Sequence, residues 1–243
     1  MNSMDKSLTV IVPFFNEEKT LRKSIDNLIS EKVAKSIILV DDKSTDNSLD
    51  IAEELVNKNS NILLLKKGLN EGKGSSVYYA KPHINTSHVI VHDADLEYYP
   101  SDIAKLFEIS KNNPRSLIVG TRTQKGVDRK KIYKTLVIIN KLLTYLFNIL
   151  NFCNVSDIAT CYMLMPTDFF KNNVGTEKRF CIEVEILSQF NKTGRSIIEM
   201  PIKYTGRKYS EGKKISISDG LEILIKIFQY SKFIEIFKLP RKS

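Results

Sequence analysis

The sequence lacks the features that mark several classes of protein. It contains no tryptophan and only three cysteines, Cys153, Cys161 and Cys181, without any Cys-x-x-Cys spacing. An odd number of thiols without that spacing argues against a disulfide framework and against a zinc site, so we expect a reducing compartment. No run reaches the roughly eighteen uncharged apolar residues that a bilayer-spanning helix needs.

The N-terminal segment does not have the pattern of a secretion signal. Its apolar stretch, residues 8–15, is interrupted by Pro13 and followed by Asn16-Glu17-Glu18, with no small-residue cleavage site. We therefore expect a first strand here and not a signal peptide. Internal repeats and low-complexity linkers are also lacking, so 243 residues fit one large domain, or one domain with appendages.

Positive charge is in excess over negative charge. Lys and Arg number 37 against 28 Asp and Glu, a net charge of +9, while the apolar fraction of 42% is ordinary for a globular core. Such a surface suits nucleic acid, anionic lipid or phosphorylated small molecules. The basic residues do not form one block, and no nucleic-acid-binding module is recognisable, so we expect no nucleic-acid partner.

Strand-like and helix-like segments alternate in the first half of the chain. Apolar, β-branched runs predict strands, and the amphipathic stretches between them predict helices. The predicted strands are 8–15, 36–40, 61–65, 87–92 and 116–120, and the predicted helices are 17–30, 46–57, 72–80 and 101–111, the last capped by Ser101. Single helices between strands imply right-handed crossovers and a doubly wound α/β sheet with parallel strands.

The second half contains two long amphipathic segments. Residues 130–152 predict one helix whose polar side carries Lys130, Lys134, Lys141, Thr144, Asn148 and Asn151. Residues 218–239 are apolar but too charged to span a bilayer. Both segments are typical of helices that lie on a membrane, although ordinary core packing explains the first equally well. Between them we expect strands at 161–165 and 196–200, a helix at 183–191 and a basic loop that ends at Lys214.

Three acidic residues directly follow the strand predicted at 87–92. Asp93, Asp95 and Glu97 stand at alternate positions in the segment His92–Glu97. In an open α/β sheet, ligands bind at the carboxyl ends of the strands. Carboxylates crowded there repel one another unless a hard cation lies between them. The cluster is therefore a candidate site for a divalent metal that holds a phosphate, with a solvated acidic loop as the alternative.

Other polar residues follow the neighbouring strands. Glu17 suits a ribose diol, because a carboxylate accepts two hydroxyl hydrogen bonds, but a favourable charge at a helix N-terminus explains it as well. Asp42 can accept a hydrogen bond from a base N–H. Lys73 lies in the glycine-containing turn 68–74, where an anion would meet a helix N-terminus. The first strand is not followed by a glycine-rich loop, which excludes a dinucleotide fingerprint and a P-loop.

Taken together, these motifs resemble a known family. VPFFNEE, VDDKSTD, the Gly-x-x-x-Gly-Lys-Gly turn, HDADLE and Gly-Thr-Arg at 120–122 occur in this order at predicted strand ends, and DIATCY, FCIEVE and YTGR continue the pattern. Over about residues 8–225 the chain resembles the family 2 inverting glycosyltransferases of the GT-A fold. Within that family it is most similar to the dolichyl-phosphate mannose synthase and polyprenyl-phosphate glycosyltransferase branch.

The resemblance implies a fold and a division of the chain. The fold would be a Rossmann-like, three-layer α/β sandwich with a mostly parallel central sheet and amphipathic interface helices. The catalytic domain would span residues 1–225 and include the interface helix at 130–152. A C-terminal amphipathic helix with a basic tail would occupy 218–243.

The resemblance also implies roles for individual residues. Those expected to act in catalysis are Asp95, Arg122, Asp157 and Arg207. Mg²⁺ or Mn²⁺ would be held by Asp93, Asp95 and Glu97. The nucleotide-sugar would be bound by Pro13, Phe15, Glu17, Val40, Asp42, Lys73, Asp93, Arg207, Lys213 and Lys214. The acceptor would be contacted by Arg122, Arg129, Lys130 and Thr160.

Two positions depart from the pattern of the family. Glu97 stands where many relatives have Gln, which makes the expected metal site one charge more negative. Met163 and Leu164 stand where relatives of the mannose synthase often carry Arg, so acceptor contacts in that region are not carried over.

We expect the chain to transfer one sugar from GDP-mannose or a UDP-hexose to a polyprenyl or dolichyl phosphate. It would do so as a peripheral enzyme on the cytoplasmic face of the membrane. Arg207 and the metal would neutralise the departing nucleoside diphosphate. A lipid phosphate is already anionic near pH 7, so no strong base is needed. The sequence leaves open whether a membrane-anchor subunit or a second copy of the chain takes part.

Three rival functions remain at this point. Transfer to a glycan hydroxyl would need a carboxylate base, and Asp157 is the candidate. A nucleotidyltransferase would normally have a glycine-rich basic loop where this chain has Asn16-Glu17-Glu18. A non-catalytic membrane adaptor would be expected to lose Asp95, and here the acidic cluster is complete.

Overall fold

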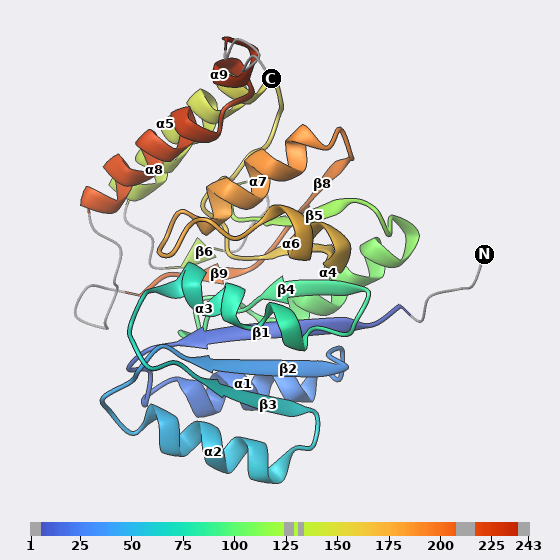
Figure 1. Ribbon diagram of the computed structural model, residues 1–243, viewed down its shortest axis with the longest axis vertical. Helices are drawn as coiled ribbons and strands as arrows, with labels where there is room; N and C mark the ends of the chain where they lie inside the picture. Colours follow the sequence, from blue (N-terminus) through green and yellow to red (C-terminus); the bar gives the residue numbers. More distant parts are fainter. Residues whose placement is uncertain (1–5, 124–128, 131–133, 208–216, 238–243) are drawn as a thin grey trace, which may run out of the picture.

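The computed structural model describes residues 6–123, 129–130, 134–207 and 217–237 (Figure 1). Its centre is a seven-stranded sheet with the strand order β3-β2-β1-β4-β7-β5-β8, and β6 and β9 form a second, two-stranded sheet. The strands are β1 Leu8–Phe14, β2 Ser36–Asp41, β3 Ile62–Lys66, β4 His88–Val91, β5 Leu117–Thr121, β6 Arg129–Lys130, β7 Met163–Pro166, β8 Ile197–Pro201 and β9 Tyr204–Thr205. The helices are α1 Leu21–Ser30, α2 Ser48–Lys58, α3 Lys73–Tyr79, the 3-10 turn η1 Lys81–His83, α4 Pro100–Asn112, α5 Lys134–Asn151, α6 Thr167–Asn173, α7 Ile182–Lys192, α8 Ile217–Tyr230 and α9 Lys232–Phe237.

β1 lies within the parallel half of the sheet, and all of its residues are buried. Such a continuous apolar strand is typical of a parallel sheet that is covered on both faces. β2 and β4 pair with β1 in parallel, and β3 extends the sheet from β2. Because α1, α2 and α3 connect these strands, the carboxyl ends of β1, β2 and β4 meet at one edge of the sheet.

The other half of the sheet interrupts the parallel series. β7 lies antiparallel between β4 and β5, and β8 then pairs in parallel with β5. The expectation of a mostly parallel sheet is confirmed, and the strand predicted at 161–165 is the exception. Its insertion brings the segment before β7 to the end of β5, where Gly120 N donates to Tyr162 O at 2.8 Å.

Several predicted boundaries in the first half are wrong. The helix predicted from residue 17 begins at Leu21, because Asn16 has a φ of +54° and the chain turns before it enters α1. The helix predicted from Ser101 begins at Pro100, whose fixed φ suits the first helical position, so Tyr99 is the N-cap. In the second half of the chain, α6 was not predicted.

The two amphipathic segments also differ from their predicted bounds. Lys130 lies in β6, which pairs with β9, and α5 begins only at Lys134. The described part of the second segment forms two helices, α8 from Ile217 to Tyr230 and α9 from Lys232 to Phe237, that are separated at Ser231. The Ser231 hydroxyl accepts from Ile234 N at 3.3 Å, which helps to start α9.

Of the two alternatives for α5, core packing is the one that the structure shows, because Phe147 and Leu150 of the predicted apolar side are buried. Thr144 and Asn151 of the polar side are buried as well, while Lys141 of that side is exposed. The outward stripe is apolar, at least 50% exposed at each position, and consists of Ile138, Leu142, Tyr145, Ile149 and, directly after the helix, Phe152. The periodicity had two apolar stripes, and the one assigned to the interface packs inward.

Further exposed apolar side chains lie on the neighbouring helices. They are Leu221, Ile225 and Phe228 of α8 and Phe233 of α9. α5, α8 and α9 lie together at the end of the molecule opposite β3 and α2 (Figure 1). We call the exposed apolar residues of these helices, with Phe152, the outer apolar surface. Within the described ranges, no helix is both long and apolar enough to cross a bilayer.

Candidate active site

A cavity of about 360 Å³ opens at the carboxyl ends of β1, β2 and β4. Its walls also include the turn before α3, the start of α7 and the segment 204–207, and Ile223 of α8 reaches into it. The predicted site residues that line it are Pro13, Phe15, Glu17, Asp42, Lys73, Asp93, Asp95, Glu97, Arg122 and Arg207. The structure therefore brings most of the predicted residues to one place.

The acidic cluster forms a tight turn after β4. Leu96 has a φ of +63°, a left-handed conformation that is uncommon for leucine, and it lets Glu97 N donate to Asp95 Oδ1 at 3.0 Å. Burial and the nearby carboxylates of Asp93 and Glu97 raise the pKa of Asp95 to about 7, although Arg207 opposes the shift. The cluster carries more negative charge than its protein neighbours neutralise.

Arg207 is the cation shared by three carboxylates from different parts of the chain. Its guanidinium lies 3.2 Å from Glu17 Oε2, 3.0 Å from Asp95 Oδ2 and 3.7 Å from Glu97 Oε1. These carboxylates raise the pKa of Arg207 further, against the effect of burial. Arg207 is therefore positioned where an anion and a metal would meet in this cavity.

Glu97 holds the segment that carries Arg207. Its side chain accepts hydrogen bonds from the Tyr204 hydroxyl and, at 2.8 Å, from the backbone N–H of Arg207. Its backbone oxygen accepts from Thr205 N at 2.9 Å. Both carboxylate oxygens of Glu97 are thus already engaged within the protein.

Lys73 joins the acidic cluster to α7. Its Nζ lies 2.9 Å from an Asp93 oxygen and 2.8 Å from Glu183 Oε1. Burial alone would lower the pKa of Lys73, but Asp93 and Glu183 hold it well above its ordinary value. Glycine is required next to it, because a Cβ on Gly74 would collide with the backbone oxygen of Glu177.

Asp42 is the anchor of the turn before α3. It forms a buried ion pair with Lys67 at 2.6 Å and accepts from Gly72 N at 2.7 Å and from Glu71 N at 3.2 Å. Two carboxylate oxygens offer about four acceptor sites, so one site is left for a ligand N–H. Lys67 was not predicted, because its charge gives no signal of burial in the sequence.

Arg122 and Asp157 form a bidentate ion pair at the end of β5. Arg122 Nε donates to Asp157 Oδ2 at 2.8 Å, and Nη2 donates to Oδ1 at 2.9 Å. Burial would raise the pKa of Asp157, but the Arg122 guanidinium more than offsets this and lowers it. The guanidinium also lies over the rings of Tyr204 and Tyr98, at 4.9 and 6.0 Å from their centroids.

The remaining predicted residues lie elsewhere. Val40 is fully buried within β2 and is not part of the cavity wall. Thr160 is also buried, and it donates to the backbone oxygen of Gly120. Arg129 and Lys130 contribute backbone to β6. Lys213 and Lys214 lie outside the described residues.

Some residues of the cavity had no predicted role. Glu183 and Tyr204 belong to motifs that carried the family resemblance, so their presence near the site could have been inferred from those motifs. Tyr98 and Ile223 carried no such signal. Ile223 reaches the cavity because α8 packs against α7, a contact that the sequence pattern does not reveal.

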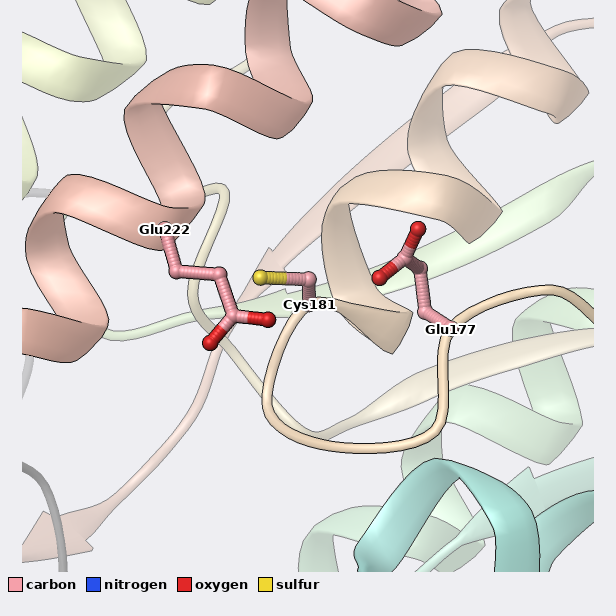
Figure 2. A group of neighbouring side chains, drawn as sticks. All are labelled: Glu177, Cys181 and Glu222. Atoms are coloured by element: carbon pink, nitrogen blue, oxygen red, sulfur yellow. The ribbon is translucent and has the colours of Figure 1, made fainter.

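A second group of ligand-type side chains lies between the loop before α7 and α8 (Figure 2). One ligand atom each from Glu177, Cys181 and Glu222 lies within 4.8 Å of the others. Glu177 is already paired with Lys226 at 2.9 Å and accepts from the Tyr230 hydroxyl at 2.5 Å. Burial, together with Glu222 and Glu177, raises the pKa of Cys181 to about 12, so the thiol is neutral. The group therefore joins the loop before α7 to α8 through contacts within the protein.

Residues 9–173 match the family described as Glycosyl transferase family 2. Among individual proteins, the chain is similar to the dolichyl-phosphate β-glucosyltransferase ALG5D of Trichomonas vaginalis, with 25% identity across 94% of this chain and 74% of that protein. It is also similar to the UDP-N-acetylglucosamine–dolichyl-phosphate N-acetylglucosaminyltransferase of Methanococcus voltae, with 26% identity across 92% of this chain and 95% of that protein.

Solved structures confirm the expected fold. The glucosyl-3-phosphoglycerate synthase of Mycobacterium tuberculosis, in complex with phosphoglyceric acid, superimposes with a TM-score of 0.71 at 13% identity, across 93% of this chain and 80% of that one. The same synthase with Mn²⁺, UDP-glucose and phosphoglyceric acid gives a TM-score of 0.70, also at 13% identity and with the same coverage. At such identities the likeness establishes the fold, which is the predicted GT-A α/β sandwich.

Proposed function

The chain belongs to glycosyl transferase family 2 and is a glycosyltransferase, and we propose that it transfers a single sugar from a nucleotide-diphosphate donor to a polyprenyl or dolichyl phosphate. The names of two relatives support a dolichyl-phosphate acceptor. A UDP-hexose is the first donor to test, since one relative uses UDP-N-acetylglucosamine and the mycobacterial synthase was crystallised with UDP-glucose. GDP-mannose is the second.

The Arg122–Asp157 pair is the observation that carries the choice of acceptor. Asp157 is fully buried, bound to Arg122 through both oxygens and held ionised by a lowered pKa. A general base needs a proton-accepting position within reach of the acceptor hydroxyl, and Asp157 offers none. Within the described part of the chain, Arg122 Nη1 has no hydrogen-bond partner, so it can donate to a phosphate in the cavity. This combination favours a phosphate over a glycan hydroxyl.

Asp93 and Asp95 would hold the divalent metal. The donor set fits such an ion, because burial and the neighbouring carboxylates of Asp93 and Glu97 raise the pKa of Asp95 to about 7, and a divalent cation would favour its ionised form. Glu97 already uses both oxygens for Tyr204 and Arg207, so we assign it to holding segment 204–207. When bound, Mg²⁺ or Mn²⁺ would supply positive charge to the diphosphate.

Lys73 and Arg207 would neutralise the rest of the leaving group. Both are paired with carboxylates of the cavity, and both have long side chains that can exchange a carboxylate for a phosphate oxygen. Asp42 retains one acceptor site for a base N–H, and Glu17 borders the same cavity near Arg207. A single attack by the acceptor oxygen on the sugar C1 then releases the nucleoside diphosphate and inverts the anomeric centre.

The outer apolar surface would rest on the membrane that contains the acceptor. It is made by α5, α8 and α9, and α8 also contributes Ile223 to the cavity. The surface therefore adjoins the place where a lipid phosphate would enter. The net charge of +9 suits an anionic bilayer. We propose a peripheral enzyme on the cytoplasmic face.

The function is tested by a donor and acceptor panel. The purified chain is incubated with UDP-glucose, UDP-N-acetylglucosamine or GDP-mannose, and with polyprenyl phosphate, a glycan acceptor or no acceptor, in Mg²⁺, in Mn²⁺ and in EDTA. Mass spectrometry should detect a lipid-linked monosaccharide phosphate that depends on one donor and on a divalent metal. Sugar transfer that needs a glycan acceptor, with no lipid product from any donor, would overturn the proposal.

Asp157→Asn separates the phosphate acceptor from the hydroxyl acceptor. If Asp157 only holds Arg122, the variant should raise the acceptor KM about tenfold and leave kcat within a factor of about ten. If Asp157 is a base, kcat should fall by about 10³-fold or more at an unchanged acceptor KM. Asp168→Asn is the matched control, because it removes a carboxylate from an exposed ion pair with Arg195.

A further inference from the structure

α5 presents a polar ladder to the interior of the protein. Asn140, Thr144 and Asn148 follow one another at four-residue spacing, so they lie on one side of the helix. Asn148 binds the backbone of Val155 through both its amide atoms, at 2.8 Å to the oxygen and 3.0 Å to the nitrogen. Thr144 Oγ1 accepts from Ile158 N at 3.4 Å.

Asn140, the first residue of this polar ladder, contacts the Arg122–Asp157 pair. Asn140 Nδ2 donates to Asp157 Oδ1 at 2.9 Å, the same oxygen that accepts from Arg122 Nη2. Its other amide atom, Oδ1, is buried and has no hydrogen-bond partner within the described ranges. The hydrogen bond to Asp157 is therefore the polar contact through which this side chain acts.

We propose that Asn140 is a positioning residue for the acceptor phosphate, which acts through Asp157 on Arg122. This inference rests on the proposed function of Arg122 in phosphate binding. Asp157 accepts from Arg122 through both oxygens and from Asn140 through Oδ1, and the backbone N–H groups of Arg122 and Ala159 also donate to it. The Asn140 amide thus helps to fix the carboxylate plane, and the carboxylate fixes the guanidinium plane. A planar guanidinium binds phosphate through paired N–H groups, and a change in its plane weakens that contact.

α5 carries both the polar ladder and part of the outer apolar surface. The polar ladder faces the site, while Ile138, Leu142 and Tyr145 lie on the outward side of the same helix. α5 therefore connects the outer apolar surface to the group that receives the lipid phosphate. One helix, α5, thus contributes both to the site for the acceptor phosphate and to the surface that would contact the membrane.

The test compares Asn140→Leu with Asn151→Leu. Asn151 is a buried asparagine on the same helix, but its partners are Phe147 O and Lys232 N, so it does not touch the segment 155–158. Affinity for a short-chain prenyl monophosphate is measured by calorimetry, and KM for donor and acceptor is measured in turnover. Asn140→Leu should weaken prenyl phosphate binding and raise the acceptor KM by about tenfold, with an unchanged donor KM. Asn151→Leu should alter thermal stability alone.

A double variant provides a measurement that a purely structural role of Asn140 would not change. In Asp157→Asn the link to Arg122 is already weakened, so adding Asn140→Leu should have less than a twofold further effect on prenyl phosphate affinity. Equal affinity in the wild type and Asn140→Leu, or full additivity with Asp157→Asn, overturns this inference alone. A wild-type chain that binds no prenyl phosphate overturns the proposed function, and this inference with it.

Discussion

The two sides of the cavity balance their charges differently. On the side that we propose for the donor, called the donor side, Lys73 pairs with Asp93 and Glu183, and Arg207 is shared by Glu17, Asp95 and Glu97. Two cations there face five carboxylates, whereas the side proposed for the acceptor is called the acceptor side. On the acceptor side, at the end of β5, one arginine faces one aspartate, with Asn140 as a neutral donor.

This difference predicts what each side needs before it can bind an anion. The donor side has an excess of negative charge, so an added cation is required before a diphosphate can enter. The acceptor side is neutral, and among the residues that the structure describes Arg122 Nη1 has no partner, so we expect a phosphate to bind there directly. We therefore expect binding of the donor diphosphate to depend on a metal and binding of the acceptor phosphate not to.

The largest effect should follow from breaking the donor side at Asp95. Asp95→Ala removes the carboxylate that the cluster crowds most and should reduce turnover by about 10³-fold or more at saturating Mn²⁺. Steady-state rates check the loss, and Mn²⁺ titration followed by paramagnetic resonance should show a lost site. Prenyl phosphate affinity should be unchanged, because Asp95 does not contact Arg122. Full activity in this variant would refute the assignment of the metal.

Replacing each arginine by lysine should separate the two sides. Arg122→Lys keeps the charge but loses the bidentate geometry, so the acceptor KM should rise about tenfold while the donor KM stays constant. Arg207→Lys should do the reverse. Initial rates measured over a grid of donor and acceptor concentrations give the donor KM and the acceptor KM of each variant. If either variant changed both KM values alike, the division into a donor side and an acceptor side would be wrong.

The donor side was largely predictable from the sequence. Glu17, Asp42 and Asp93 stand directly after predicted strands, and the carboxyl ends of parallel strands converge, so local patterns were sufficient to gather them. What the pattern could not reveal is how they are neutralised. The partnership of Arg207 with Glu17 joins residues at opposite ends of the chain, and Lys67 is buried beneath Asp42 by tertiary packing.

The acceptor side was predictable only in part. Arg122 and Asp157 were both singled out, but their ion pair depends on β7 inserting antiparallel beside β5, which periodicity does not encode. The burial of polar residues on α5 was not predicted for a related reason. Asn148 and Thr144 look solvent-facing in a helical pattern, yet Thr144 is buried and Asn148 half-buried, and both satisfy backbone groups of 155–158.

A smaller effect should follow from changing the outer apolar surface. Leu142→Glu combined with Ile225→Glu places charge on α5 and α8, and each exposed apolar side chain that inserts into a bilayer contributes about 1.5–3 kcal/mol. Co-sedimentation with anionic vesicles should fall by about tenfold or more, while turnover of a short-chain, water-soluble prenyl phosphate persists. Leu63→Glu, which alters an exposed leucine of β3, is the matched control. Unchanged sedimentation would mean that another surface meets the membrane.

The smallest effect concerns pH, because the two sides should respond in opposite directions. The pKa of Asp95 is raised from 3.8 to about 7. In EDTA, between about pH 4 and 7, the folded chain therefore keeps a proton on Asp95 that the unfolded chain has released. The contribution of Asp95 to the free energy of unfolding thus falls as the pH rises through this range. The pKa of Asp157 is lowered, so its contribution is lost as the pH falls below 3.8. Asp95→Asn should flatten the first slope and Asp157→Asn the second, by about 2–4 °C in melting temperature. Mn²⁺ should raise the melting temperature most at pH 7 and above, where Asp95 ionises. Parallel curves for wild type and Asp95→Asn between pH 4 and 7 would show that burial and the neighbouring carboxylates do not oppose the ionisation of Asp95.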